Sequence, residues 1–474
     1  MTPSHNRAPM PSPHRAWDDL IEFVEARRRS RQPVSELEDF ERELHRRFAA
    51  AEAEVVGREL ERLDIDAPAV EIEGVVHRQV LRCEETYLTS AGEVRILRSL
   101  YSTRQAGERA VCPMELRAGL VEGRYTPLAA KQATWAVAHL VPQEGEDLFR
   151  LLGGMQPSKA SLDRLPKVLS ARWEENREAF EQALRAQEDV PKEAVTVAIS
   201  LDGVLAPMKD GQRAQLREEA QAQGKQTRGP AGYKEVGCAT VSLYDAEGNR
   251  LRTLRLGRMP EPKKATLKQA LQQELAAILE QRPELQVVKV ADGAKDNWRY
   301  LSGLPVAGIP VADFYHAAEH LNTAVVAAYG ESSPKGQAQF EKLRHLLRHD
   351  NQGVEKVIRA LGYLREQHPR STKLATELRY FRHNRHRMQY AKLAAKNLPI
   401  GSGVVEATCK TLVTQRMKRS GMRWRHEGGQ AILTFRALAQ SDRFDLGWLL
   451  LAGTYRRAVS LPENIISLAD RRPR

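Results

Sequence analysis

The spacing of apolar and polar residues divides the chain into segments with different periodicities. Residues 16–64 are densely charged, with apolar positions recurring roughly every three or four residues, which predicts one or two amphipathic helices. Residues 70–103 alternate on both sides of a Ser-Ala-Gly turn, a pattern typical of a β hairpin. A helical pattern returns over 126–186. We therefore expect a mainly α N-terminal region with a small β hairpin.

One helical stretch has the form of a DNA-binding unit. In 146–169 an apolar helix breaks at Gly153-Gly154, and Ser158 is placed to cap a second helix. As a helix-turn-helix, this unit would put the second helix in the major groove, with Lys159 and Arg164 on its exposed side. An ordinary helical hairpin that packs on its neighbours explains the pattern equally well.

Residues 194–314 change character and predict strand, strand, strand, helix, strand, helix, strand. Short turns between the first three strands, followed by alternating strands and helices, indicate an α/β core with a mixed sheet flanked by helices. This order is the one found in ribonuclease-H-like domains. Residues 316–395 then form an almost continuous helical pattern rich in Arg, Lys and His, which predicts an all-α insertion.

Charge and composition narrow the class of protein. Lys and Arg number 73 against 61 Asp and Glu, a formal net charge of +12, and this balance favours an anionic partner such as nucleic acid. Mean hydropathy is −0.51, and no apolar run approaches the length of a membrane span. The four cysteines are scattered without a C-x-x-C pair, so neither a disulfide framework nor a zinc ribbon is expected. We expect a cytoplasmic protein with a disordered leader at its N-terminus.

Three acidic residues are candidates for metal-dependent chemistry. Asp202 and Asp292 each end an apolar strand, and Glu406 follows Gly401-Ser402-Gly403 at the start of a helix. Phosphoryl transfer needs two cations to activate the attacking oxygen and stabilise the leaving one, and Mg²⁺ favours carboxylate oxygens. Taken singly, such residues are more often helix caps or turn residues. Their combination in this strand order favours a site for two Mg²⁺ or Mn²⁺ ions.

Four blocks of sequence resemble a known family: ISLDGV, VKVADGAKDNW, ADFYHAAEHL and PIGSGVVEATCKTLVTQRMKRSGMRW. They are similar, in this order, to the DDE transposases of bacterial insertion sequences in the group labelled ISKra, which is related to the Mutator superfamily. The resemblance spans roughly residues 110–440. It implies a ribonuclease-H-like core with an α-helical insertion before the last acid, and it carries the family's Asp, Asp and Glu onto Asp202, Asp292 and Glu406.

The resemblance also implies a role for a second motif, an acidic or Cys residue followed three positions later by His, which matches Asp313 and His316. From its position, Asp313 is equally suited to cap the helix that begins near Tyr315. His316 is suited to orient a group of the site or to contact the scissile phosphate. The family's N-terminal cysteine pairs are not matched, since only the unpaired Cys83 and Cys112 are present there.

A different function is compatible with one short pattern. His316, Glu319 and His320 fit the H-x-x-E-H arrangement of a zinc metallohydrolase, with two imidazoles on one face of a helix. That interpretation explains neither the strands that end in aspartate nor the basic insertion.

Basic and aromatic residues outside the three acids are the predicted DNA contacts. Those in the insertion would follow a DNA backbone, those after Glu406 would contact phosphates beside a stacking surface, and Trp298 would stack on a displaced base. A position buried against the sheet fits Trp298 better than base stacking does. The predicted set is Lys159, Arg164, Trp298, Arg382, Arg385, Arg387, Arg416, Lys418, Arg419, Arg423 and Trp424.

The sequence thus predicts a DNA transposase that cleaves element ends and transfers them to target DNA. The resemblance also implies that it acts on double-stranded DNA as a homo-oligomer. A DNA-binding protein that keeps the fold without activity is the alternative. The predicted segments are a leader (1–15), a helical arm with a small β region (16–109), a helical region (110–190), the first part of the core (191–315), the α insertion (316–398) and the end of the core with a basic tail (399–474).

Overall fold

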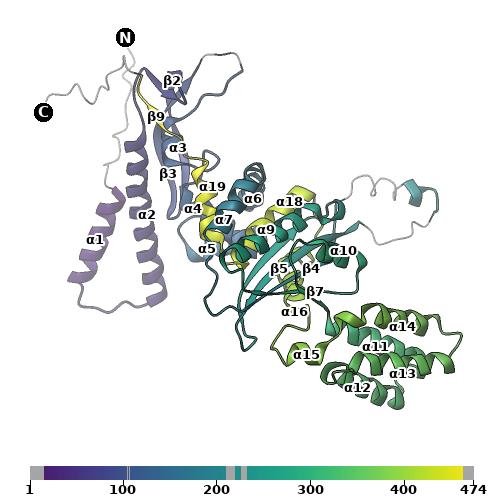
Figure 1. The fold of residues 1–474 in the computed structure, drawn as a ribbon. Coiled ribbons are helices and arrows are strands. Elements are labelled where there is room, and N and C mark those ends of the chain that lie inside the picture. Colours follow the sequence, from purple (N-terminus) through teal and green to yellow (C-terminus); the bar gives the residue numbers. More distant parts are fainter. Residues whose placement is uncertain (1–14, 104, 106, 210–218, 226–231, 463–474) are drawn as a thin grey trace, which may run out of the picture. The chain divides into compact units, whose positions relative to one another are not determined.

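The computed structural model describes residues 15–462, apart from 104, 106, 210–218 and 226–231 (Figure 1). The proposed leader, except Arg15, and the basic tail lie outside the described residues. The chain forms two compact units, Met1–Glu175 with Asp445–Arg474, and Asn176–Phe444. This division differs from the sequence-based segments, because the residues after 444 group with the N-terminal elements. None of the described helices is both long and apolar enough to cross a bilayer.

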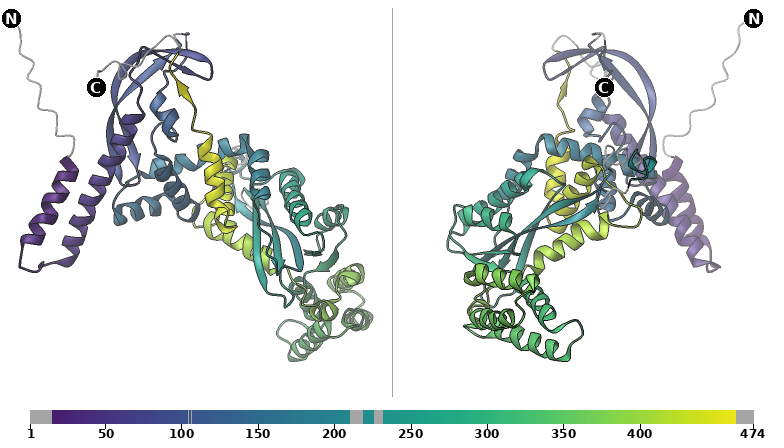
Figure 2. Two further views of the ribbon diagram at one scale, coloured as in Figure 1. Left: turned by 60° about the vertical axis from the view of Figure 1, so that its left-hand side comes forward. Right: turned by 90° about the vertical axis from the view of Figure 1, so that its right-hand side faces the viewer.

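The N-terminal unit begins with the two helices that the periodicity predicts, α1 (Arg15–Arg29) and α2 (Leu37–Leu63), which lie beside each other as a helical arm (Figure 2). Phe23 stacks on Phe40 with ring centroids 5.8 Å apart. The guanidinium of Arg47 lies over the Phe23 ring at 4.6 Å. The apolar stripe therefore holds the arm together, while the charged residues face solvent.

The predicted β hairpin is one part of a larger sheet. Strands β2 (Val75–Thr89) and β3 (Gly92–Ser102) pair antiparallel across the Ser-Ala-Gly turn, as expected. Two further strands, β1 (Ala69–Ile72) and β9 (Val459–Ser460), extend the sheet to the order β3-β2-β1-β9. The hairpin is confirmed, but the two further strands were not predicted, because β1 and β9 are too short to show a period and β9 reaches its partner only through the tertiary fold.

Helices complete the N-terminal unit: α3 (Pro113–Ala118), α4 (Pro127–His139), α5 (Pro142–Leu152), α6 (Lys159–Glu175) and α19 (Phe444–Gly453). Ser158 precedes α6 and its Oγ accepts a hydrogen bond from the Ser161 N–H at 3.3 Å, so the predicted cap is present. Residues 153–158 join α5 to α6, a longer connection than the roughly three or four residues typical of a helix-turn-helix.

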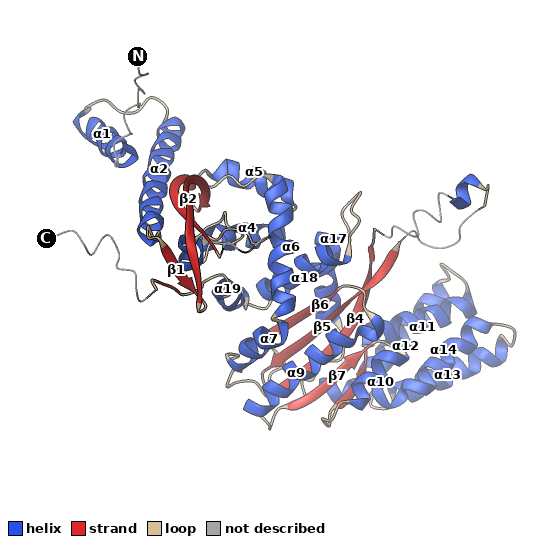
Figure 3. Ribbon diagram, turned by 90° about the horizontal axis from the view of Figure 1, so that it is seen from above, coloured by secondary structure: helices blue, strands red, loops and turns tan. Residues whose placement is uncertain are grey.

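A five-stranded mixed sheet forms the centre of the second unit, in the order β6-β5-β4-β7-β8 (Figure 3). Strands β4, β5 and β6 are antiparallel neighbours, whereas β7 and β8 run parallel to β4. The sequence predicts these elements in this order. They are β4 (Thr196–Pro207), β5 (Tyr233–Tyr244), β6 (Arg250–Arg258), α9 (Ala265–Gln281), β7 (Gln286–Ala291), α10 (Lys295–Gly303) and β8 (Ile309–Ala312).

Helices cover both faces of this sheet. Val197, Ile199 and Leu201 of β4 pack in one core cluster with α9 and α10. Cys238 of β5 belongs to another cluster, which includes Leu412 and Leu433 from the C-terminal helices. Those helices are α16 (Gly403–Thr408), a π-helical turn η3 (Cys409–Thr414), α17 (Gln415–Met417) and α18 (His426–Gln440), with α7 (Arg177–Ala186) preceding the sheet. The strands are buried on both faces, which explains their nearly continuous apolar runs.

The residues between β8 and α16 are all helical or connecting, as predicted. They form α11 (Phe314–Tyr329), α12 (Pro334–His349), α13 (Gly353–Gln367), α14 (Thr372–Asn384), a 3₁₀ turn η2 (Arg385–Arg387) and α15 (Tyr390–Ala394) (Figure 1). Leu321, Leu347 and Leu361 are among the buried residues that join this helical insertion to the sheet. Each such leucine contributes roughly 1.5–3 kcal/mol by leaving water, so the insertion is held firmly against the sheet.

Candidate active site

Asp202 lies on β4, the central strand of the sheet, opposite Cys238 of β5. Its Oδ1 accepts a hydrogen bond from the Gly203 N–H at 2.7 Å. The thiol of Cys409 donates to Asp202 Oδ2 at 3.8 Å. Burial raises the pKa of Asp202, and the neighbouring Asp292 carboxylate raises it further. Two carboxylates, Asp202 and Asp292, thus lie close together in a partly buried position, and a bound cation would compensate their charges.

Asp292 follows β7, which lies beside β4 and runs parallel to it. In the parallel register Ser200 lies opposite Val290, and Asp202 and Asp292 each come two residues later, which brings them near each other. Asp202 therefore lies within β4, which continues to Pro207, and not at the strand end that the sequence predicts. Asp292 Oδ1 accepts hydrogen bonds from the Ala294 N–H at 3.0 Å and from Asn297 Nδ2 at 3.1 Å. The indole N–H of Trp298 donates to the Asp292 carbonyl at 2.6 Å. The start of α10 therefore fixes this carboxylate.

Both aspartates line a single cavity of about 660 Å³. Its other walls come from the segment before α9, from the first turns of α9 and α10, and from β5. The remaining lining residues are Glu235, Glu261, Lys263, Lys264, Lys268, Ala294, Asp296, Asn297, Arg299 and Tyr300. A cavity of this size beside two carboxylates has room for a polar ligand.

Glu406 lies on α16, and the turn before it is tied to α11. Ser402 Oγ donates to Glu406 Oε1 at 2.7 Å, while the Ser402 N–H donates to Asp313 Oδ2. A Cβ on Gly401 would lie 3.0 Å from the Tyr315 ring and 3.4 Å from Asp313 Oδ2. Gly401 is therefore needed for the close approach of this turn to α11.

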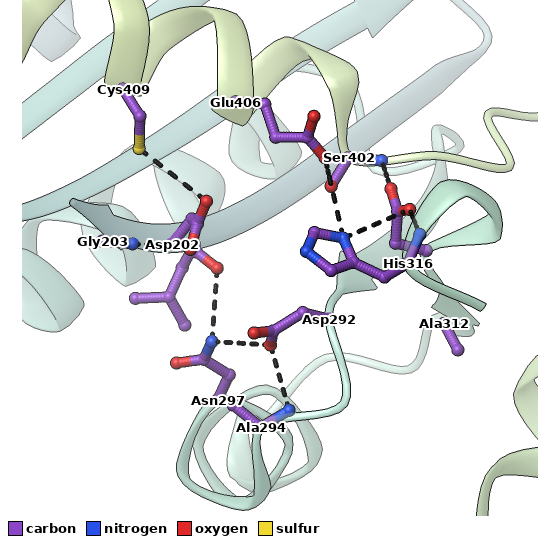
Figure 4. A network of polar contacts seen from close by, with 12 residues as sticks. Asp202, Gly203, Asp292, Ala294, Asn297, Ala312, His316, Ser402, Glu406 and Cys409 are labelled. Atoms are coloured by element: carbon purple, nitrogen blue, oxygen red, sulfur yellow. Dashed lines mark hydrogen bonds and ion pairs between the residues drawn. The ribbon is translucent and has the colours of Figure 1, made fainter. Parts of the chain in front are cut away.

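His316 lies between Asp313 and Glu406. Its Nδ1 is 3.4 Å from Asp313 Oδ1 and 3.7 Å from Glu406 Oε1 (Figure 4). Asp313 Oδ1 also accepts the His316 N–H at 2.7 Å, so Asp313 caps α11 as the sequence suggests. The hydrogen bond to Asp313 raises the pKa of His316 to about 9, and Glu319 and Glu406 add to this. Burial favours a higher pKa for Asp313, but hydrogen bonds from His316 and Ser402 outweigh it and lower its pKa.

The side chains of Asp202, Asp292, His316 and Glu406 come from four separate elements and lie around a common space (Figure 4). Asp202 is electrostatically coupled to both Asp292 and His316. The carboxylate oxygens of Asp202, Asp292 and Glu406 suit a hard divalent cation such as Mg²⁺. Within the described part of the chain, donor atoms of Asp313, His316 and Glu406 also lie within 4.8 Å of one another. Asp202 and Asp292 are not part of that group in the described residues. The carboxylates of Asp202, Asp292 and Glu406 are nevertheless the type of ligand that Mg²⁺ prefers.

Several residues of this site were not singled out from the sequence. Asn297 donates to Asp292 and to the Leu201 carbonyl at 3.5 Å, so it bridges α10 and β4. Ser402 joins Asp313 and Glu406, and Cys409 contacts Asp202. Asn297 and Ser402 both lie within the sequence blocks that flank the candidate acids, and their polar side chains beside those acids are the signal that the sequence offered.

The residues predicted to contact DNA differ in how exposed their side chains are. Trp298 is 4% exposed and Arg416 is 2% exposed. Trp298 is held by its bond to Asp292 and by the Arg387 guanidinium, 4.0 Å from the ring centroid. These two side chains are part of the core and do not offer a surface to DNA. Arg387 and Trp424 are half-buried, whereas Lys159, Arg164, Arg382, Arg385, Lys418, Arg419 and Arg423 are exposed.

The arrangement around His320 differs from that of a zinc site. His320 Nδ1 lies 2.5 Å from Glu377 Oε2, and its ring stacks on Tyr380 at 3.7 Å. His316 instead contacts Asp313 and Glu406. In the described residues, the group able to hold a metal includes His316 without His320. The two imidazoles therefore engage different carboxylates.

Asn297→Ala is expected to weaken binding of Mg²⁺ or Mn²⁺ by about 10- to 100-fold, because hydrogen bonds that orient a ligand carboxylate contribute at this level. The buried amide of Asn297 holds Asp292 and cannot be replaced by solvent without reorientation of the carboxylate. Isothermal titration with Mn²⁺ measures the effect, and Asn249→Ala, in the turn between β5 and β6, is the matched control. Equal Mn²⁺ affinity in the Asn297 variant and the wild type would show that Asn297 does not position Asp292.

Gly293→Ala is expected to destabilise the protein by roughly 1–3 kcal/mol, the usual cost of overpacking. An added Cβ would lie 2.6 Å from Cε2 of Tyr380, whose ring already stacks on His320. Gly303→Ala is the control, since nothing lies within 4 Å of the position of its Cβ. Urea denaturation of both variants measures the difference. Equal midpoints would mean that the Tyr380 ring moves away without cost.

Comparisons with known proteins give little further information. No family model matches the chain, and a search of curated proteins finds no significant match. Among solved structures, the chain has a likeness to a protein of the Drosophila P element transposase strand transfer complex, at 13% sequence identity and a TM-score of 0.26. The match covers 74% of this chain and 83% of that one.

Proposed function

We propose that this chain is a DNA transposase of the DDE type, which cleaves DNA and transfers the cut end to a target with two Mg²⁺ or Mn²⁺ ions. The observation that carries the proposal is the placement of Asp202 and Asp292 in one cavity at the edge of the sheet. Glu406 lies beside His316. The charge of His316 in turn interacts electrostatically with the Asp202 carboxylate.

The fold supports this proposal. The strand order β6-β5-β4-β7-β8, with the first three strands antiparallel and the last two parallel to β4, is the arrangement expected of a ribonuclease-H-like core. The helical insertion stands between β8 and the helix that bears Glu406, as the resemblance to ISKra-type transposases implies. One fold serves many activities, so the residues of the site, and not the fold, determine the function.

The division of roles in this proposal follows from the contacts. Asp202, Asp292 and Glu406 would hold the metal ions, which would supply activation of the attacking oxygen and stabilisation of the leaving oxygen. Asn297 and Ser402 orient two of the three carboxylates. Asp313 holds His316, which as a cation beside Glu406 is suited to contact the scissile phosphate.

DNA would be bound outside the site by the exposed basic residues. Arg382 and Arg385 lie at the end of α14 and in η2, and Lys418, Arg419 and Arg423 follow the helix of Glu406. Such residues contact phosphates and give affinity without base specificity. Lys159 and Arg164 on α6 are the proposed contacts to the element ends, and a homo-oligomer would bring two ends together.

The proposal is tested by incubating the purified full chain with supercoiled plasmid DNA and either Mg²⁺, Mn²⁺ or EDTA. Nicked and linear products that require a divalent cation support the transposase. DNA binding without any cleavage would instead identify a DNA-binding protein that keeps the fold. Peptide hydrolysis that depends on Zn²⁺ and is lost in His320→Ala would contradict the proposal in favour of a metallohydrolase.

A further inference from the structure

The cavity beside the two aspartates also carries positive charge that the proposed cleavage chemistry does not use. The cavity that holds Asp202 and Asp292 (both aspartates are drawn in Figure 4) is also lined by Lys263, Lys264, Lys268 and Arg299. Lysine side chains are strongly hydrated point charges that suit phosphate oxygens. These basic side chains lie next to carboxylates that would hold metal ions, and the proposed cleavage chemistry assigns them no role.

The acidic residues of the lining, other than the two aspartates, already have partners. Glu235 accepts from Lys264 Nζ at 2.9 Å, Asp296 pairs with Arg299 at 2.9 Å, and Glu261 Oε1 accepts the backbone N–H of Leu267 at 2.9 Å. The pair of Asp296 and Arg299 is highly exposed, with both side chains 81% accessible, so it contributes little. None of these contacts is an ion pair with Lys263 or Lys268.

Neither Lys263 nor Lys268 has a carboxylate within ion-pair distance among the residues that the structure describes. Lys268 Nζ lies 5.5 Å from the centroid of the Tyr300 ring, a contact that leaves its N–H groups able to donate. Lys263 and Lys264 are both in the left-handed region, with φ of 56° and 53°. Consecutive L-residues rarely adopt this backbone, so the turn before α9 keeps Lys263 at the cavity despite a conformational cost.

We propose that Lys263 and Lys268 bind a backbone phosphate of DNA, next to the scissile phosphodiester, in the strand that enters this cavity. The inference rests on the proposed function, because it requires DNA at Asp202 and Asp292. Once divalent cations compensate those two carboxylates, the remaining net charge of the cavity is positive, and a phosphodiester is the anionic group that adjoins the scissile one. The contact is independent of base sequence and fixes the register of the strand.

The test compares Lys263→Ala, Lys268→Ala and the double variant with the wild-type full chain. Lys192→Ala, an exposed lysine ahead of β4, is the matched control for loss of one charge, since Lys192 does not line the cavity. Binding to a fluorescent duplex is measured at several salt concentrations, and nicking of supercoiled plasmid is measured with Mg²⁺. Each single variant is expected to reduce the slope of log affinity against log salt by about 1. We expect KM to rise about tenfold while kcat changes less, because the contact binds the strand before and during the reaction.

A second arm locates the phosphate. Each duplex in a set carries one uncharged methylphosphonate, at a different position around the cleavage point. Cleavage of every duplex is measured with the wild type and with the double variant. The wild type should lose efficiency at one position beside the scissile phosphate, and the double variant should be insensitive at that position. That pattern establishes the contact.

The outcomes separate the two proposals. If the wild type and the double variant cleave with equal KM, equal salt slopes and the same methylphosphonate profile, the phosphate contact is wrong and the transposase proposal stands. If the wild type shows no cleavage with Mg²⁺ or Mn²⁺, the proposed function fails and this inference fails with it. Equal losses in Lys192→Ala would show a general charge effect, which also overturns the assignment to this cavity.

Discussion

Asp202→Asn, Asp292→Asn and Glu406→Gln are each expected to reduce metal-dependent DNA cleavage by about 10³-fold or more. Loss of one ligand carboxylate removes several kcal/mol of charge stabilisation in the transition state, and each 1.4 kcal/mol is about a tenfold change in rate. Nicking of supercoiled plasmid with Mg²⁺ measures the effect. DNA binding in EDTA should change little, because phosphate affinity depends on the basic residues.

The same variants separate a role in chemistry from a role in the fold. Burial and Asp292 raise the pKa of Asp202, so its charged form is disfavoured in the metal-free protein. Asp202→Asn removes that repulsion and should leave the metal-free thermal midpoint equal or higher. Asp189→Asn, an exposed carboxylate ahead of β4, is the control and should keep full activity. Loss of cleavage with a large drop in the midpoint of Asp202→Asn would mark this residue as structural.

Arg443→Met is expected to lower the free energy of unfolding by about 3–5 kcal/mol, because it leaves a buried carboxylate without its partner. Arg443 donates to Glu274 through two bonds of 2.8 and 2.9 Å and to Glu188 at 2.6 Å. Its side chain is 7% exposed, and those of Glu188 and Glu274 are 3% and 4% exposed. Urea denaturation of the full chain, followed by circular dichroism, measures the change.

Two further variants test the cause of this loss. In the double variant Arg443→Met with Glu274→Met, the buried Glu274 carboxylate that lost its partner is also removed. This variant should recover part of the free energy of unfolding, since Glu188 keeps its ion pair with Arg252. Arg344→Met breaks an exposed pair with Glu341 and should cost less than about 1 kcal/mol. If Arg443→Met and Arg344→Met had equal midpoints, the buried network would not stabilise the fold.

The elements of the core were predictable because their signals are local. Val197, Ile199 and Leu201 make β4 apolar, and the order of strands and helices through 194–314 follows from such runs and the turns between them. Asp202 and Asp292 were identifiable because each follows an apolar run, although Asp202 lies within β4 and only Asp292 follows the end of its strand. Trp298 could not be placed from sequence alone, because an aromatic residue after a strand suits both a base-stacking surface and a core, and packing alone decides between them.

Long-range pairing accounts for what was missed. Strand β9 contributes only Val459 and Ser460, and its partner β1 lies near the other end of the chain, so no local period reveals the four-stranded sheet. Arg416 belongs to a strongly basic run, yet it is buried beside Trp424. A run of charges does not tell which of its members turns inward, because that depends on the neighbours that the fold supplies.

Local patterns along the chain were enough to predict the type and order of the elements in the core, its basic character and the three candidate acids. The arrangement in space was needed to show that Asp202 and Asp292 share a cavity, that His316 lies beside Asp313 and Glu406, and that His320 pairs with Glu377. The reason is physical. Periodicity and turn residues act over a few neighbours, whereas a site is made by strand pairing and helix packing between segments far apart in the chain.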